Sequence, residues 1–210
     1  MIAKADRYWQ KWNDQAHRQG VLSFWKDDPE QRERREHLYN VMTPLFPRLK
    51  GRTLLDFGCG TGEDYPFLSG SGFTYRGVDI TPEMIAVAQQ AHPGADVGID
   101  DILQSSQSDN SHALVVNNAI LLHLPFERLW VAVKELYRVA SEAVVIRYPG
   151  VDNFPEDRLF EIGGFLYNRI TYKTFVRLME SCAPQGLEIE RGGTPGTRDV
   201  CIATLWKAKQ

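Results

Sequence analysis

LLDFGCGTGE, residues 54–63, runs an apolar strand into a turn that contains three glycines. Glycines at alternate positions let the backbone turn sharply and approach a ligand with no Cβ in the way. A helix that follows such a turn offers unpaired N–H groups at its N-terminus. The segment therefore predicts a strand, turn and helix unit whose turn binds a nucleotide-type ligand.

The spacing of these glycines differs from the dinucleotide fingerprint G-x-G-x-x-G, whose third glycine would fall at position 63. This chain has Glu63 there, and its third glycine is Gly62. Asp56 ends the strand directly before the turn, where a carboxylate repels a pyrophosphate and attracts a cation. The pattern therefore favours a ligand with a positively charged end over a nicotinamide dinucleotide.

A second acidic residue, Asp79, ends the next apolar run in the segment RGVDI. A carboxylate at the tip of the second strand can accept hydrogen bonds from both hydroxyls of a ribose. Dinucleotides and cationic nucleosides both contain a ribose whose hydroxyls need such an acceptor. Asp79 therefore supports a nucleoside ligand without separating the two classes.

Short apolar runs alternate with helical patterns from residue 52 onward. Runs of this length without clean alternation are typical of strands buried on both faces of a parallel sheet. Strand, helix and strand at this spacing predict right-handed crossovers and an α/β, doubly wound sheet. The predicted strands are RTLLDF, FTYRGVDI, ADVGI, HALVVNN and EAVVIRY, followed by GLEIER and DVCIATLW near the C-terminus.

The N-terminal region, residues 1–50, has a helical pattern and is predicted to form a cap or lid on a ligand-binding domain of residues 51–210. Its first helix carries Tyr8 and Trp12, which either pack in the core or cover a substrate. Residues 149–170 interrupt the strand and helix rhythm with two prolines and a pair of glycines. We expect this insertion to cover the substrate from the other side.

The bulk composition is that of an ordinary globular domain, with 43% hydrophobic and 24% charged residues in 210. A net charge of −3 gives no electrostatic footprint for nucleic acid. Three cysteines at wide spacings suggest neither a disulfide framework nor a metal site. No apolar run approaches the length of a membrane span, and no signal peptide is apparent. We therefore expect a cytoplasmic protein, monomeric or homodimeric, without membrane or nucleic-acid partners.

The motifs taken in order resemble those of the class I, Rossmann-like methyltransferases that depend on S-adenosylmethionine (SAM), in their small-molecule branch. The resemblance covers residues 50–148 well and the last forty residues weakly. It rests on LLDFGCGTG (54–62), GVDITPEMIAVAQ (77–89) and VVNNAILLHLPFERLWVAVKELYRV (115–139). It implies a seven-stranded, mostly parallel sheet with an antiparallel hairpin at one edge, and a small-molecule acceptor.

The resemblance also implies roles for single residues. The methionine part of SAM would lie at Asp56 and at the backbone of Gly58, Cys59 and Gly60. Asp79 would hold the ribose, and Ile80 and Met84 the adenine face. Asp101 and Ile102 match the position that holds the adenine edge, with Asp100 adjacent and not separable from Asp101. Asn117 matches the position whose backbone meets the methionine amino group.

Methyl transfer from a sulfonium is an in-line displacement, so the enzyme mainly aligns the two reactants and excludes water. His123 follows the fourth strand and is either a general base or a hydrogen-bonded structural residue. Arg147 and Tyr148 end the fifth strand, where an arginine either holds an anionic substrate group or pairs with a neighbouring carboxylate. With Tyr8 and Trp12, they are the candidate substrate-binding residues.

Several alternatives differ from this hypothesis in their sequence requirements. Residues 117–120 read NNAI and lack the Asn/Asp-Pro-Pro-Tyr/Phe motif of base-methylating DNA enzymes. The same segment has no clustered aspartates for a hard cation, so we expect no metal. A nicotinamide oxidoreductase is disfavoured by Glu63 and Asp56. A non-catalytic SAM-binding or regulatory module stays open.

Overall fold

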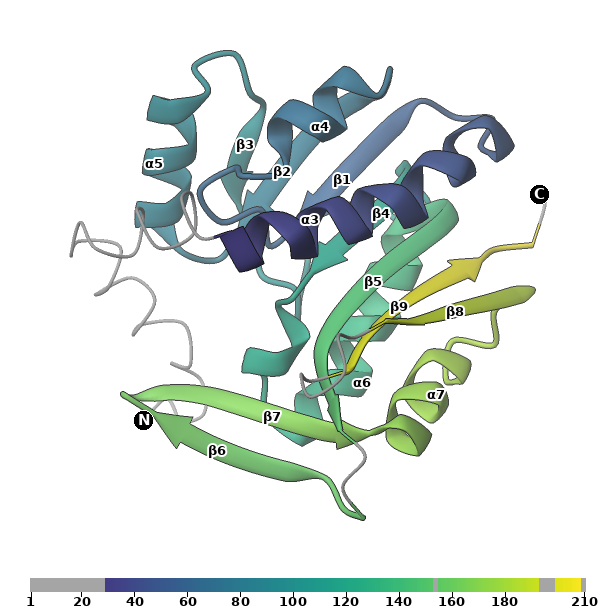
Figure 1. Ribbon diagram of the computed structural model, residues 1–210. Coiled ribbons are helices and arrows are strands. Elements are labelled where there is room, and N and C mark those ends of the chain that lie inside the picture. Colours follow the sequence, from purple (N-terminus) through teal and green to yellow (C-terminus); the bar gives the residue numbers. More distant parts are fainter. Residues whose placement is uncertain (1–28, 153–154, 193–198, 209–210) are drawn as a thin grey trace.

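The structure is a computed structural model that describes residues 29–152, 155–192 and 199–208. Its centre is a nine-stranded sheet in the order β3-β2-β1-β4-β5-β7-β6, with β9 pairing with both β5 and β8 (Figure 1). The strands are β1 Thr53–Phe57, β2 Thr74–Asp79, β3 Val97–Ile99, β4 His112–Asn118, β5 Ala140–Asp152, β6 Arg158–Ile162, β7 Phe165–Thr171, β8 Gly186–Gly192 and β9 Asp199–Trp206. The helices are α3 Pro29–Met42, η2 Thr43–Arg48, α4 Tyr65–Gly70, α5 Pro82–Ala91, η3 Leu121–His123, α6 Phe126–Val139 and α7 Tyr172–Glu180.

The expected doubly wound sheet is confirmed. Strands β1 to β5 pair in parallel, while β9 runs antiparallel to both β5 and β8. These seven strands are the predicted ones, and the β8 and β9 hairpin closes one edge. In this order β1 and β4 are adjacent although two strands separate them in the chain, so their carboxyl ends open a crevice between them.

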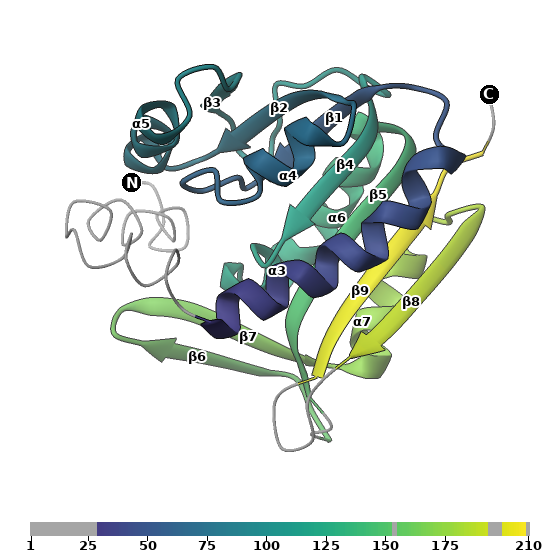
Figure 2. The same ribbon diagram turned by 45° about the horizontal axis from the view of Figure 1, so that its top comes forward.

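Helices cover both faces of the sheet, because alternate residues of its strands point to opposite sides. Leu114 of β4 belongs to a core with α3, η2 and α4, whereas the next residue, Val115, belongs to a core with α6 and α7 (Figure 2). Both side chains are completely buried. The runs that looked continuously apolar in the sequence are therefore strands buried on two faces.

The described part of the N-terminal region packs on this sheet. Helix α3 starts at Pro29, which suits a first helical position because proline has no N–H to leave unpaired. Apolar residues at helical spacing in this region are buried: Leu38, Met42, Leu45 and Leu49 are each at most 4% exposed. Residues 1–28, with Tyr8 and Trp12, lie outside the described residues.

The insertion at 149–170 consists of the end of β5 and a β-hairpin. Strand β5 runs to Asp152, and its last two residues, Val151 and Asp152, pair in parallel with Ile170 and Thr171 of β7. Strands β6 and β7 pair antiparallel across Gly163 and Gly164, both at positive φ as a tight turn requires. The hairpin extends beyond the main sheet on the side where β1 and β4 end (Figure 1).

Candidate active site

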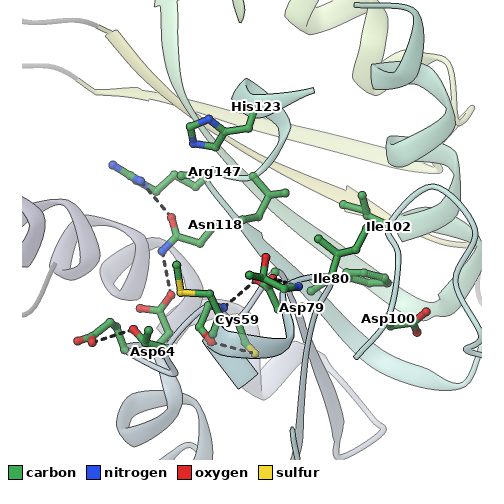
Figure 3. A pocket seen from close by; sticks show the side chains of 18 of the residues that line it. Cys59, Asp64, Asp79, Ile80, Asp100, Ile102, Asn118, His123 and Arg147 are labelled. Atoms are coloured by element: carbon green, nitrogen blue, oxygen red, sulfur yellow. Dashed lines mark hydrogen bonds between the residues drawn. The ribbon is translucent and has the colours of Figure 1, made fainter. Parts of the chain in front are cut away.

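One cavity of about 200 Å³ lies at the carboxyl ends of β1, β2 and β4. It is built by the glycine turn after β1, the tip of β2, the segments after β3 and β4, Arg147 within β5, and helix α3 (Figure 3). The lining residues that carry the argument below are Arg34, Arg35, Gly58, Cys59, Gly60, Asp64, Asp79, Ile80, Met84, Asp100, Ile102, Asn118, Ile120, His123 and Arg147.

The glycine turn adopts a backbone that other residues would strain. Gly58 and Gly60 have φ of +86° and +52°. A Cβ on Gly58 would lie 2.2 Å from Cγ1 of Ile120, so this glycine allows the segment after β4 to close on the turn. A Cβ on Gly60 would meet no atom within 4 Å, and Gly60 lines the cavity. The space above Gly60 is therefore available to a ligand.

Asp79 connects the tip of β2 to this turn. Its Oδ2 accepts from the Gly60 N–H at 3.1 Å, and its Oδ1 accepts from the Thr81 N–H at 2.9 Å. Burial raises the pKa of its carboxyl, and the hydrogen bonds from Thr81, Gly60 and Ile80 oppose that rise. Asp79 thus holds the glycine turn, and its side chain lines the cavity, where a carboxylate can accept from a hydroxyl.

Asp56 is placed differently from the other expected ligand residues. It is 1% exposed, does not line the cavity, and accepts from the Tyr75 hydroxyl at 3.0 Å. Its pKa lies well above the usual range, chiefly through burial and then through the charges of Asp64 and Asp79, while the Tyr75 hydrogen bond lowers it. Three carboxylates therefore surround the glycine turn, and such a cluster is stabilised by a cationic ligand.

Burial also raises the pKa of the Cys59 thiol, and the neighbouring carboxylates Asp56 and Asp79 add to this rise. Cys59 lines the cavity and is 8% exposed. Because a thiolate is disfavoured in this negative environment, the side chain is an inert neutral thiol. Its contribution to a site is the backbone and shape of the turn.

The opposite end of the cavity is apolar. Ile80, Met84 and Ile102 line it as the sequence predicts, and Figure 3 places Ile80 and Ile102 together on one side of Asp79. Of the two neighbouring acids, Asp100 lines the cavity and Asp101 does not.

The carboxylates of these two acids are both used within the loop after β3. That of Asp100 accepts from the side chains of Ser105, Ser106 and Gln107 and from two backbone N–H groups. Asp101 accepts from the Leu103 N–H at 2.9 Å. Groups of the loop itself therefore occupy most of the hydrogen-bond acceptor sites of these two carboxylates.

The end of β4 brings two asparagines to different places. Asn117 is completely buried and donates from Nδ2 to the Phe57 carbonyl at 2.8 Å, which locks β4 to β1. Asn118 lines the cavity, donates to Asp64 at 2.8 Å and accepts from Arg147 at 3.0 Å. Sequence reasoning named Asn117 and missed Asn118 and Asp64. Asn118 is the last residue of β4, and its side chain points to the face opposite that of Asn117, because successive side chains of a strand alternate.

The two candidate residues of β5 also separate. Arg147 lines the cavity, whereas Tyr148 is completely buried and packs edge to face with Phe175 of α7, at a centroid distance of 5.9 Å. Successive side chains of a strand point to opposite faces, so only one of the two can reach the cavity. The structure therefore brings Arg147 to the site and leaves Tyr148 in the core.

His123 lines the cavity next to the hairpin. Its Nδ1 lies 3.0 Å from the carbonyl oxygen of Leu166, and its ring meets Tyr167 edge to face at 4.9 Å. A carbonyl only accepts, so Nδ1 carries the proton of the neutral ring. Burial lowers the pKa of His123 to about 4, against the smaller opposing effect of the Leu166 hydrogen bond. At neutral pH this imidazole is uncharged.

The low pKa of His123 predicts a pH-dependent stability. Between its folded pKa of about 4 and its ordinary value of 6.5, the unfolded chain binds more protons than the folded one. Stability is therefore lost as the pH falls through this window, by about 2 kcal/mol between pH 7 and pH 5. Urea unfolding of His123→Asn, whose amide can still donate to Leu166, should lack this component. Equal losses in the variant and the wild type would contradict it.

The described parts of the chain contain no group of three or more side chains placed to hold a metal ion. Within the same parts, no helix is long and apolar enough to cross a bilayer.

Residues 54–142 match the family described as methyltransferase domain. A Haemophilus influenzae protein, described as uncharacterized, is 26% identical over 136 residues. The match covers 61% of this chain and 46% of that protein, so the chain spans about half the length of this relative.

Several solved structures share this fold. A Pyrococcus horikoshii protein superposes with a TM-score of 0.71 at 19% identity, covering 89% of this chain and 96% of that one. Magnesium protoporphyrin IX methyltransferase from Synechocystis, with bound SAM, gives 0.69 at 17% identity and covers 99% and 100%. The Burkholderia thailandensis 1,6-didemethyltoxoflavin-N1-methyltransferase gives 0.64 at 15% identity, covering 100% and 92%.

The chain therefore has the class I, Rossmann-like fold, and its residues 54–142 are similar to the methyltransferase domain family. At such identities the solved structures establish the fold, and the chemistry must be argued from the site.

Proposed function

We propose that this protein binds SAM in the cavity at the carboxyl ends of β1, β2 and β4 and transfers its methyl group to a small molecule. The observation that carries the proposal is the glycine turn with Asp79 bonded to the Gly60 N–H, beside the carboxylates of Asp56 and Asp64. An acceptor for ribose hydroxyls and a group of carboxylates that favours a cation therefore lie around the glycine turn.

The residues fit SAM in three respects. The open space above Gly60 would take the methionine part, which carries the positive charges that the carboxylates favour. Asp79 would accept from the ribose, and Ile80, Met84 and Ile102 would pack on the adenine. Two known structures of this fold are described with SAM or S-adenosylhomocysteine bound, which supports the same ligand here.

When bound, SAM supplies a methyl group on a sulfonium, and the displacement leaves a neutral thioether. The chain's own residues then have three tasks: they hold the acceptor in line, exclude water and take a proton where the acceptor has one to lose. His123 lines the cavity as a neutral imidazole with its proton on Nδ1, so its Nε2 has the form of a hydrogen-bond acceptor. We propose that Nε2 of His123 takes the proton from the hydroxyl or amine of the methyl acceptor.

Two segments are proposed to close the acceptor end. Helix α3 places Arg34 and Arg35 on the cavity, and the insertion places the Leu166 carbonyl and the Tyr167 ring against His123. We therefore propose that the N-terminal region and the hairpin together cover the acceptor. The Burkholderia thailandensis methyltransferase named above is described with a small molecule, 1,6-didemethyltoxoflavin, bound, which supports a small acceptor here.

Calorimetric titration of the purified chain tests the cofactor assignment. S-adenosylhomocysteine should bind in the micromolar range or tighter, at about −8 kcal/mol, and NADH should not bind. Incubation with methyl-labelled SAM and a metabolite extract should then place the label in a new small molecule. Binding of NADH but not of S-adenosylhomocysteine would overturn the proposal. Binding of S-adenosylhomocysteine without methyl transfer to any molecule would indicate a SAM-binding module.

A further inference from the structure

Arg147 is an unusual residue for the wall of this cavity, because its charged group is buried and only partly bonded. The residue is 4% exposed. Its Nη1 donates to the Asn118 side chain at 3.0 Å, whereas Nε and Nη2 have no hydrogen-bond partner among the described residues. A buried donor without a partner is destabilising, and more so when it is charged.

The guanidinium is held in one orientation by a chain of hydrogen bonds. Asn118 accepts from Arg147 and donates to Oδ2 of Asp64, and Oδ1 of Asp64 accepts from the Tyr39 hydroxyl at 2.6 Å. Figure 3 shows Arg147, Asn118 and Asp64 as a row on the side of Asp79 opposite to Ile80 and Ile102. These hydrogen bonds fix the guanidinium of Arg147 through Nη1 and leave its other edge, with Nε and Nη2, unused.

The charge around Arg147 also lacks compensation. No described carboxylate forms a salt bridge with it; Asp64 acts through Asn118. The pKa of Arg147 falls to about 10, first through burial and then through the charge of Arg34, while Asp64 opposes the fall. Arg34 and Arg35 line the same cavity. An anion in this part of the cavity would therefore be stabilised.

The two unused donors identify the kind of anion. Nε–H and an Nη2–H lie parallel on one edge of a guanidinium, and this fork matches the two oxygens of a carboxylate. The surrounding wall includes the apolar side chains Phe57 and Ile120. We propose that Arg147 binds the carboxylate of the methyl acceptor through this edge, so that the acceptor is a carboxylic acid with an apolar body.

The inference rests on the proposed function, and the carboxylate has a second conceivable source in the methionine end of the cofactor. The position of Arg147 favours the acceptor. It lies beside His123 at the end of the cavity away from Ile80 and Ile102, and Asn118 and Asp64 lie between it and the glycine turn (Figure 3). The experiment separates the two sources.

The test compares wild type, Arg147→Met, Arg147→Lys and the control Arg76→Met. Arg76 pairs with Asp96 on the surface, at 2.9 Å, and does not line the cavity. Calorimetry measures affinity for S-adenosylhomocysteine and for 5′-methylthioadenosine, which lacks the amino-acid end. The protein saturated with S-adenosylhomocysteine is then titrated with benzoate, phenylacetate, 4-hydroxybenzoate and hexanoate, each alongside its methyl ester.

At least one acid should bind the wild type about tenfold or more tightly than its ester. Both Arg147 variants should lose this preference and keep their affinity for S-adenosylhomocysteine within about threefold of the wild type. The control Arg76→Met should behave like the wild type in both measurements. The melting temperature of Arg147→Met without ligand should equal or exceed that of the wild type, because a buried uncompensated charge is removed. Arg147→Lys keeps the charge and loses the fork, so it tests the geometry even if the methionine variant folds poorly.

Three results would overturn the assignment. The first is that no acid in the set is preferred to its ester in the wild type, and the second is that the preference survives in both Arg147 variants. Alternatively, the variants could lose affinity for S-adenosylhomocysteine but not for 5′-methylthioadenosine, which would give the arginine to the cofactor's carboxylate. Failure of the wild type to bind S-adenosylhomocysteine at all would instead remove the proposed function itself.

Discussion

Replacement of Asp79 by alanine should lower the affinity for S-adenosylhomocysteine by about a hundredfold or more. The variant leaves two ribose hydroxyls without a charged acceptor, and each such hydrogen bond contributes about 1.5–3 kcal/mol. It also frees the Gly60 N–H, which the Asp79 carboxylate holds at 3.1 Å. Calorimetric titration of the wild type and the variant measures the loss.

Asp79→Asn is the matched variant, since it keeps the shape and one acceptor oxygen and should bind more tightly than Asp79→Ala. Asp96→Asn on the surface, where Asp96 pairs with Arg76, controls for the loss of one negative charge. Unchanged affinity in Asp79→Ala, with the fold intact by circular dichroism, would remove Asp79 from the binding site.

Alanine at Gly58 should give the largest loss of stability in the glycine turn, about 3 kcal/mol in the free energy of unfolding. The φ of +86° costs an alanine about 1–2 kcal/mol, and the new methyl would lie 2.2 Å from Cγ1 of Ile120. Alanine at Gly60 is the matched comparison, because it has a positive φ of +52° but meets no atom within 4 Å.

Gly60→Ala should therefore lose only about 1–2 kcal/mol of stability, while S-adenosylhomocysteine affinity falls at least about tenfold because the methyl enters the cavity. Urea unfolding and calorimetry on both variants separate the two roles. If the two alanines cost the same stability, or if Gly60→Ala binds normally, the division into one closing glycine and one glycine that makes room for the ligand would be wrong.

Much of the fold could be predicted because its signals are local. The glycine turn follows directly from the spacing of Gly58, Gly60 and Gly62, and the buried face of α3 from the repeat that includes Leu38 and Met42. The hairpin of β6 and β7 was expected only as an interruption. The pair Gly163-Gly164 between two runs rich in strand-forming residues was a usable hairpin signal.

The site was harder to predict than the fold, because a side chain at the end of a strand reaches the cavity only if the sheet turns it that way. Asp56 and Asn117 sit at the right depth in the chain, yet neither lines the cavity: Asp56 bonds to Tyr75 and Asn117 to the Phe57 carbonyl. Asp64 and Asn118 line it through a mutual hydrogen bond across 54 positions of sequence. Contacts of this range carry no signal in a single sequence.

Asn168 ties the hairpin to the segment after β4. Its Nδ2 donates to the carbonyls of Leu121 and Leu124, and His123 bonds to the Leu166 carbonyl of the same strand. Three hydrogen bonds thus join β7 to η3 and the residue after it. Helix η3 begins directly after Ile120, whose side chain packs against Gly58. Exchanging this hairpin between relatives should therefore change the position of η3 as well, and with it the packing of Ile120 against Gly58.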